Sequence, residues 1–149
     1  MARPTDPNRF LDPAEADDLA CAVREAESRT SAEIRVVLVR HCWGDLRRKA
    51  IRTFRKLELD RTVQRNCVMI MLVLANHEFL IYGDRGIHEQ VGQGFWDETR
   101  DLMARHFADG EFGEGLCAAV RQVGEKLAAL YPWREDDVNE IPDEFVMAE

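Results

Sequence analysis

The amino-acid sequence predicts a small, single-domain α/β protein built on a mixed β-sheet. Three segments rich in β-branched and apolar residues, 33–39, 67–74 and 79–82, have the composition of strands. Amphipathic segments around them have the apolar spacing of helices. At 149 residues the chain fits one domain, and a domain of that size buries about two-thirds of the surface of its unfolded chain. Neither a disulfide nor a metal is needed to form such a core.

A capping pattern predicts the first helix at 13–28. Asp12 precedes Pro13, and Glu15 follows the cap by three residues, which is the order of a capping box with proline at the first helical position. Apolar residues then recur at helical spacing. The segment 33–39 is apolar at nearly every position, which indicates a strand covered on both faces.

A crossover helix and a hairpin are predicted next. The segment 46–57 has one apolar stripe and basic residues on its other faces, which is typical of a helix lying on a sheet. Because this helix connects 33–39 to 67–74, we expect these two strands to be parallel. Only four residues separate 67–74 from 79–82, and this short gap predicts an antiparallel hairpin.

The remaining chain is predicted to be helical up to Pro132. We expect a short helix at 87–91, a longer one at 94–106, a glycine-rich turn at 110–113 and a last helix at 114–130. Four to five helices would then flank a sheet of three to four strands.

Composition divides the chain into an extension at 1–11, a domain at 12–132 and an acidic tail at 133–149.

No run approaches the roughly 20 apolar residues that span a bilayer, so we expect neither a signal peptide nor a membrane segment. The cysteines lack a CxxC motif, which favours buried thiols in a reducing compartment and a cytoplasmic protein. They are Cys21, Cys42, Cys67 and Cys117.

Charge is unevenly distributed along the chain. A formal net charge of −8 argues against nucleic-acid binding, because phosphate neutralisation requires a positive surface. Eight Lys or Arg residues nevertheless lie within 47–65, whereas the last 15 residues hold seven acids and no base. Two interpretations stay open: a solvated helix face, or a surface for an acidic protein or anionic lipid. The candidate surface residues are Arg48, Lys49, Arg52 and Lys56.

Three polar segments are expected to meet at one end of the sheet. A parallel pair puts the start of 67–74 beside the start of 33–39, and the hairpin returns the end of 79–82 to the same place. The polar segments at this end are 30–33, 65–66 and 83–86.

Asp84 is the central residue of this expected site. The neighbouring glycines Gly83 and Gly86 allow a sharp turn, and a carboxylate among amide and hydroxyl oxygens suits a hard cation such as Ca²⁺ or Mg²⁺. A phosphate group would then bridge the cation and Arg65 or Arg85. The equal alternative is structural: Asp84 caps the following helix and pairs with an arginine.

Two other segments also have both a chemical and a structural interpretation. His41, Cys42 and Trp43 resemble part of a zinc site, but no second half exists at zinc spacing, which favours a strand end with a packed tryptophan. Asp109 is a candidate further ligand, although a helix–helix turn explains it equally. The sequence contains no GxSxG, P-loop or HExxH motif.

Five phrases occur in a recognisable order: TSAEIRV at 30–36, TVQRNCV at 62–68, IYGDRGI at 81–87, VGQGFW at 91–96 and FADGEFGEGL at 107–116. Over 12–132 the chain resembles the TPM domain family, whose members include thylakoid phosphatase-like photosystem II repair proteins and bacterial envelope proteins. The phrase at 139–144 is similar to the tail of its short bacterial branch, which lacks a signal peptide and a membrane helix.

The resemblance implies an α/β/α sandwich and, in some members, a divalent-cation site beside the Gly-Asp-x-Gly turn. Asp84 is carried over from that turn, and Glu33, Asn66 and Arg65 lie in matching phrases. Asp109 is added as a further candidate ligand.

Three functions are open. The first is a domain that binds a divalent cation and acts through a protein partner or the membrane surface. The second is a metal-assisted phosphomonoesterase, because phosphatase activity is attributed to some plant members. The third is a metal-independent adaptor that uses the basic helix. The resemblance also implies a LemA-type membrane protein as partner, and so a cytoplasmic protein at the inner membrane.

Overall fold

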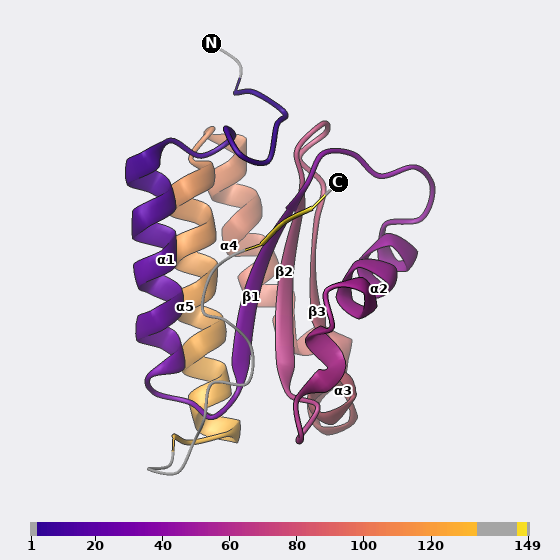
Figure 1. Ribbon diagram of the computed structural model, residues 1–149. Coiled ribbons are helices and arrows are strands. Elements are labelled where there is room, and N and C mark those ends of the chain that lie inside the picture. The colour runs from indigo at the N-terminus through magenta and orange to yellow at the C-terminus, as the bar shows by residue number, and fades with distance from the viewer. Residues whose placement is uncertain (1–2, 134–145, 149) are drawn as a thin grey trace.

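The computed structural model describes residues 3–133 and 146–148. Helices and strands alternate along the first half, and helices dominate the second (Figure 1). The elements are α1 (Pro13–Glu27), β1 (Glu33–Val39), α2 (Leu46–Lys56), η1 (Leu59–Arg61), β2 (Cys67–Val73), β3 (Phe79–Gly83), α3 (Arg85–Val91), η2 (Gln93–Trp96), α4 (Asp97–Ala108), α5 (Phe112–Leu130) and β4 (Val146–Ala148).

The sheet is mixed, with strand order β3-β2-β1-β4. β1 and β2 are parallel, with Glu33 opposite Cys67, and β2 and β3 are antiparallel, with Val68 opposite Gly83. These pairings confirm the crossover and the hairpin predicted from the sequence. β4 pairs in parallel with the outer edge of β1, a strand that the sequence analysis did not predict. The rest of the expected acidic tail, at 134–145 and 149, lies outside the described residues.

Two unequal helical layers cover the sheet (Figure 1). Helices α1, α4 and α5 lie on one face, where they pack against Ile34, Val36 and Leu38 of β1. On the other face α2 packs Phe54 against a second core that contains Val37. Alternate side chains of β1 therefore enter different cores, and all seven of its residues are buried, as are all seven of β2. The expected α/β/α sandwich is confirmed.

Local capping explains where the first two helices begin. The Asp12 side chain accepts a hydrogen bond from the Glu15 amide, and the Glu15 side chain accepts one from the Asp12 amide, so the predicted capping box is present. Asp45 caps α2 by accepting a bond from the Arg48 amide at 2.9 Å. Both helices thus begin where the sequence places an acid before an amphipathic run.

Helix α5 begins at Phe112, inside the segment that the sequence analysis expected to be a turn. Gly113 is helical, and a Cβ atom there would lie 2.6 Å from Oε2 of Glu15. This glycine allows α5 to approach α1 closely; Gly110, with φ of 76°, makes the turn.

Two side-chain expectations were wrong. Trp43 is not packed at the strand end but is 80% exposed. Its ring contacts only that of His41 among the described aromatic rings, at 4.8 Å between centroids, and Gly44 beside it has φ of 91°. Cys21 is exposed, whereas Cys67 and Cys117 are buried free thiols. None of the helices in the described part of the chain combines the length and apolar character that a bilayer span requires.

The segment before α1 packs on the domain. Phe10 and Leu11 are buried in the larger core, and Arg3 forms two hydrogen bonds to the Glu15 carboxylate, at 2.6 and 2.7 Å. The Arg3 guanidinium lies 5.4 Å from the centre of the Phe10 ring. Hydrogen bonding from Arg3 lowers the pKa of Glu15. Described residues of the expected extension are therefore part of the folded unit.

The lowered Glu15 pKa predicts a pH-dependent contribution to stability. A carboxyl whose pKa is depressed on folding stabilises the fold above its unfolded pKa of about 4.3, and this contribution is lost as pH falls through the folded pKa. Replacing Arg3 with Ala should lower the free energy of unfolding by about 0.5–1 kcal/mol at neutral pH. The difference should shrink in acid without vanishing, because the contact with Phe10 does not titrate.

Urea unfolding of wild type and Arg3→Ala across pH 3–7 measures this difference. Arg29→Ala, at the exposed pair with Glu25, is the control and should cost less at every pH. A difference for Arg3→Ala that stays constant across the range would contradict the assignment.

Candidate functional site

The three polar segments predicted to converge do meet at one end of the sheet. The Asp84 amide donates to the Cys67 carbonyl at 2.9 Å, and the Gly86 amide donates to the Arg65 carbonyl at 2.9 Å. Glu33 lies opposite Cys67 in the register of β1 and β2. The crossover and the hairpin thus bring these segments together, as the topology rule predicts.

Within this end of the sheet, Asp84 is engaged on both oxygens. Its Oδ2 accepts from Nε of Arg65 at 2.8 Å, and its Oδ1 accepts from Nη2 of Arg65 at 2.9 Å and from the Arg85 amide at 2.7 Å. Asp84 is the N-cap of α3 and only 2% exposed. This arrangement is the structural alternative stated above: a helix cap paired with an arginine in a bidentate geometry.

The backbone explains why Arg65 reaches Asp84. Arg65 has φ of 52°, in the left-handed region, just before β2 begins. Gly86 lies against this bend, and a Cβ atom there would lie 2.2 Å from the Gln64 carbonyl oxygen. Only glycine allows this approach. Hydrogen bonding to Asp84 raises the pKa of Arg65.

Glu33 belongs to a separate buried ion-pair network. Arg35 is fully buried and bonds Glu27 at 2.7 Å and Glu33 at 3.3 Å. Glu27 also accepts a bond from the Ile34 amide at 2.7 Å. Because each carboxylate here has arginine or amide partners, a cation at this end would have to displace them. Cation binding at Asp84 and Glu33 stays a prediction, and it would require the loss of these arginine and amide contacts.

The other predicted residues lie in different surroundings. Asn66 is buried just before β2, and its backbone N–H donates to Oγ1 of Thr62 at 3.1 Å. Arg85 is exposed. Asp109 is the C-cap of α4 and is not brought to Asp84. The ring of Phe112, three residues on, lies 4.5 Å from that of His77 in the β2–β3 connection, at the opposite end of the sheet.

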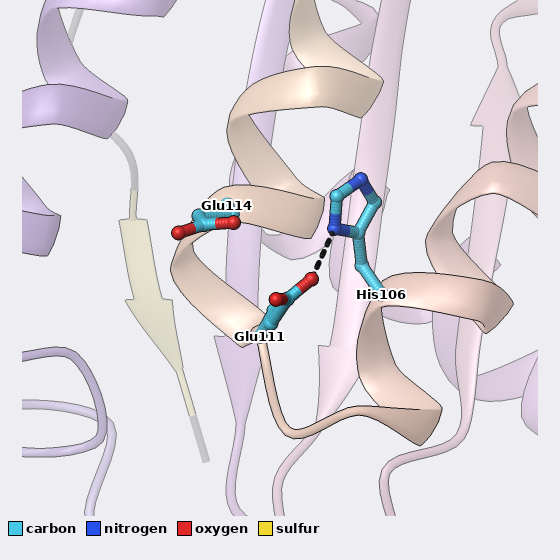
Figure 2. Close-up of side chains that lie close together, drawn as sticks. All are labelled: His106, Glu111 and Glu114. Carbon is cyan, nitrogen blue, oxygen red and sulfur yellow. Dashed lines mark hydrogen bonds and ion pairs between the residues drawn. The ribbon is translucent and has the colours of Figure 1, made fainter.

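A different cluster at that opposite end has the composition of a metal site. Figure 2 shows His106 at the end of α4 turned toward Glu111 and Glu114 at the start of α5. One ligand atom from each residue lies within 4.8 Å of the other two. Nδ1 of His106 lies 2.9 Å from Oε1 of Glu111.

The α4–α5 corner is held tightly. The Glu111 amide donates to the His106 carbonyl at 2.9 Å, which closes the turn. A Cβ atom at Gly115 would lie 2.8 Å from Cβ of His106, so the glycine sets how closely α5 approaches α4. Glu111 is the N-cap residue of α5, and Glu114 lies in its first turn.

This corner is open to solvent. The His106 side chain is 27% exposed and that of Glu111 is 44% exposed. Asp109 was the ligand predicted in this turn from the sequence, whereas His106, Glu111 and Glu114 were not predicted as metal ligands. The available signal was the spacing of one histidine and two glutamates across a predicted helix–helix turn. Only the tertiary fold shows that one ligand atom of each lies within 4.8 Å of the other two.

The fold defines the class of this protein: an α/β/α sandwich domain with a mixed sheet and charged groups at both ends. The TPM domain profile matches residues 4–126, and the chain belongs to the TPM domain family. The family expected from the five phrases is confirmed.

Two solved structures are similar to this chain. The NMR structure of the BA42 protein from the psychrophilic bacterium Bizionia argentinensis has 36% sequence identity and a TM-score of 0.88, with 93% of this chain and 96% of that one covered. The N-terminal domain of a protein from P. gingivalis has 20% identity and a TM-score of 0.66, covering 84% and 82%. The second likeness shows the fold alone. No curated protein sequence matches the chain significantly.

The Arg65–Asp84 contact predicts strong energetic coupling. In a double-mutant cycle on unfolding with Arg65→Met and Asp84→Asn, the coupling should be about 1–2 kcal/mol, because the charge-assisted pair is bidentate and one partner is buried. Asparagine keeps an acceptor for the helix cap, so the cycle isolates the ion pair. The exposed Arg85→Met is the matched control and should show coupling near zero. Equal coupling for the two arginines would refute the specific pair.

Proposed function

We propose that this TPM domain binds a divalent transition-metal ion such as Zn²⁺ at the α4–α5 corner, through His106, Glu111 and Glu114. The observation that carries the proposal is the approach of one imidazole nitrogen and two carboxylate oxygens to within 4.8 Å of one another. This proposed site is distinct from the cation site predicted at Asp84, which lies at the other end of the sheet.

The donor set favours this class of ion over Ca²⁺ or Mg²⁺. Imidazole nitrogen suits zinc and its neighbours, whereas Ca²⁺ takes about six to eight oxygen ligands. Three protein ligands with a solvent-filled fourth position are a common zinc arrangement. Ca²⁺ or Mg²⁺ at Asp84 stays a separate prediction, one that requires Arg65 to move.

The corner needs little rearrangement to close on such an ion. Tetrahedral zinc with ligand bonds of about 2.0–2.1 Å holds its donor atoms about 3.4 Å apart. Nδ1 of His106 and Oε1 of Glu111 are already 2.9 Å apart. The remaining movement falls on Glu114, which is exposed and free to change rotamer.

The alternative enzymatic function has less support. A phosphomonoesterase at Asp84 was expected to hold phosphate with Arg65 or Arg85, but the Arg65 guanidinium is bonded to Asp84. Two predictions from the sequence stay predictions. One is action through a protein partner, including a LemA-type membrane protein, and the other is a cytoplasmic location at the inner membrane.

An amide NMR titration of metal-stripped protein with Zn²⁺, then with Ca²⁺ and Mg²⁺, tests the proposal. A Cys21→Ser background removes the exposed thiol, which would itself bind zinc. We expect saturable shifts confined to 105–115, and a gain in unfolding free energy of about 2.7 kcal/mol when Zn²⁺ is at 100 times its dissociation constant.

His106→Gln and Glu114→Gln should each abolish the shifts and the stabilisation. His88→Gln is the matched control, because it removes an exposed histidine at the Asp84 end. Shifts that appear instead at 65–66 and 83–86 would return the site to Asp84. If no saturable shift appears at the α4–α5 corner or at the Asp84 end of the sheet, the proposed cation binding is wrong.

A further inference from the structure

We infer that the outer side of α2, together with Trp43, docks the protein onto a bilayer containing anionic phospholipid. This Trp43–α2 surface consists of Trp43, Arg48, Ile51, Arg52, Arg55 and Lys56. It lies across the sheet from α4 and α5 (Figure 1). The inference therefore does not rest on the proposed cation site.

The basic residues of this surface form one stripe. Arg48, Arg52 and Lys56 are spaced four residues apart, so they project from the same side of α2. These three and Arg55 are exposed, and the described residues contain no acid that forms an ion pair with any of them. Lys49, a predicted surface residue, is half-buried and does not belong to the Trp43–α2 surface.

Acids flank the stripe at its two ends and do not lie within it. Glu58 is exposed two residues after Lys56. Asp45 directs its carboxylate to the Arg48 amide as the cap of α2, and α2 itself contains no acidic residue. Helix α2 therefore presents several positive charges to solvent although the whole chain has a formal charge of −8. Such local charge attracts an anionic surface within about one Debye length, near 10 Å at 0.1 M salt.

Trp43 distinguishes a bilayer from an acidic protein as the occupant. Its side chain is 80% exposed and lines a shallow surface hollow together with Arg48, Ile51 and Arg52. Asp45, whose carboxylate caps α2, also borders this hollow. An indole beside basic side chains fits the lipid interface, where the ring enters the region between headgroups and acyl chains and the guanidinium groups bind phosphate. Charge complementarity to an acidic protein would explain the arginines but not the exposed indole.

Binding of the protein to lipid vesicles tests the inference. Flotation is compared for vesicles of phosphatidylcholine alone and for vesicles that also contain phosphatidylglycerol. We expect binding only to the second kind, with about fivefold weaker affinity for each basic residue neutralised. Trp43→Ser should also weaken binding and should abolish a blue shift of the tryptophan fluorescence.

Matched charge reversals provide the control. Arg48→Glu with Arg52→Glu should abolish binding, whereas Arg105→Glu with Arg121→Glu, which changes the net charge equally on exposed parts of α4 and α5, should leave it nearly unchanged. Circular dichroism of each variant verifies folding, and metal-stripped protein keeps the test separate from the cation site.

Three results would overturn the inference. They are no binding to phosphatidylglycerol vesicles, equal loss with both charge reversals, and binding to poly-glutamate without binding to vesicles. The last result would assign the Trp43–α2 surface to an acidic protein partner.

Discussion

The complete burial of β1 and β2 is the constraint on which the rest of the structure depends. Every residue of both strands is buried, so each face of the sheet must carry helices, and the parallel pairing requires a crossover between the strands. Helix α2 is that crossover. The single arginine within β1, Arg35, is tolerated because Glu27 and Glu33 bind it. Groups that bind other molecules are therefore restricted to the sheet ends and to the outer sides of the helices.

Most of the fold follows from local sequence patterns. The strand at 33–39, the capping box at Asp12 and the hairpin after 67–74 each depend on residues close in sequence, and each is present in the structure. Features that depend on distant contacts were missed. Gly113 suggests a turn when considered with its neighbours alone, yet its role is to admit Glu15 of α1 beside α5. β4 is set by an edge of β1 about 110 residues earlier, which no periodicity within residues 146–148 could indicate.

For the candidate sites too, local sequence and topology predict some features, whereas others depend on distant contacts. Chain topology alone predicted that the segments around Glu33, Asn66 and Asp84 would meet. Whether Asp84 is open to a cation depends on a left-handed residue, Arg65, that lies 19 positions earlier and turns its guanidinium onto the carboxylate. The α4–α5 corner likewise depends on the close approach permitted by Gly115. Residue type shows which side chains can bind a metal, but only packing determines which of them lie together.

The two proposed surfaces are compatible because the sheet separates them. If α2 lies against a bilayer, then α4 and α5, on the other face of the sheet, are turned toward the aqueous phase (Figure 1). A chain with formal charge −8 is repelled by an anionic membrane in most orientations. Docking therefore requires the basic stripe of α2 to face the membrane. The basic stripe and Trp43 together favour this orientation, and in it the corner is accessible to a cation from solution. A cation there would reduce the negative charge of the chain without occupying the basic residues of α2, because the two places lie on different elements.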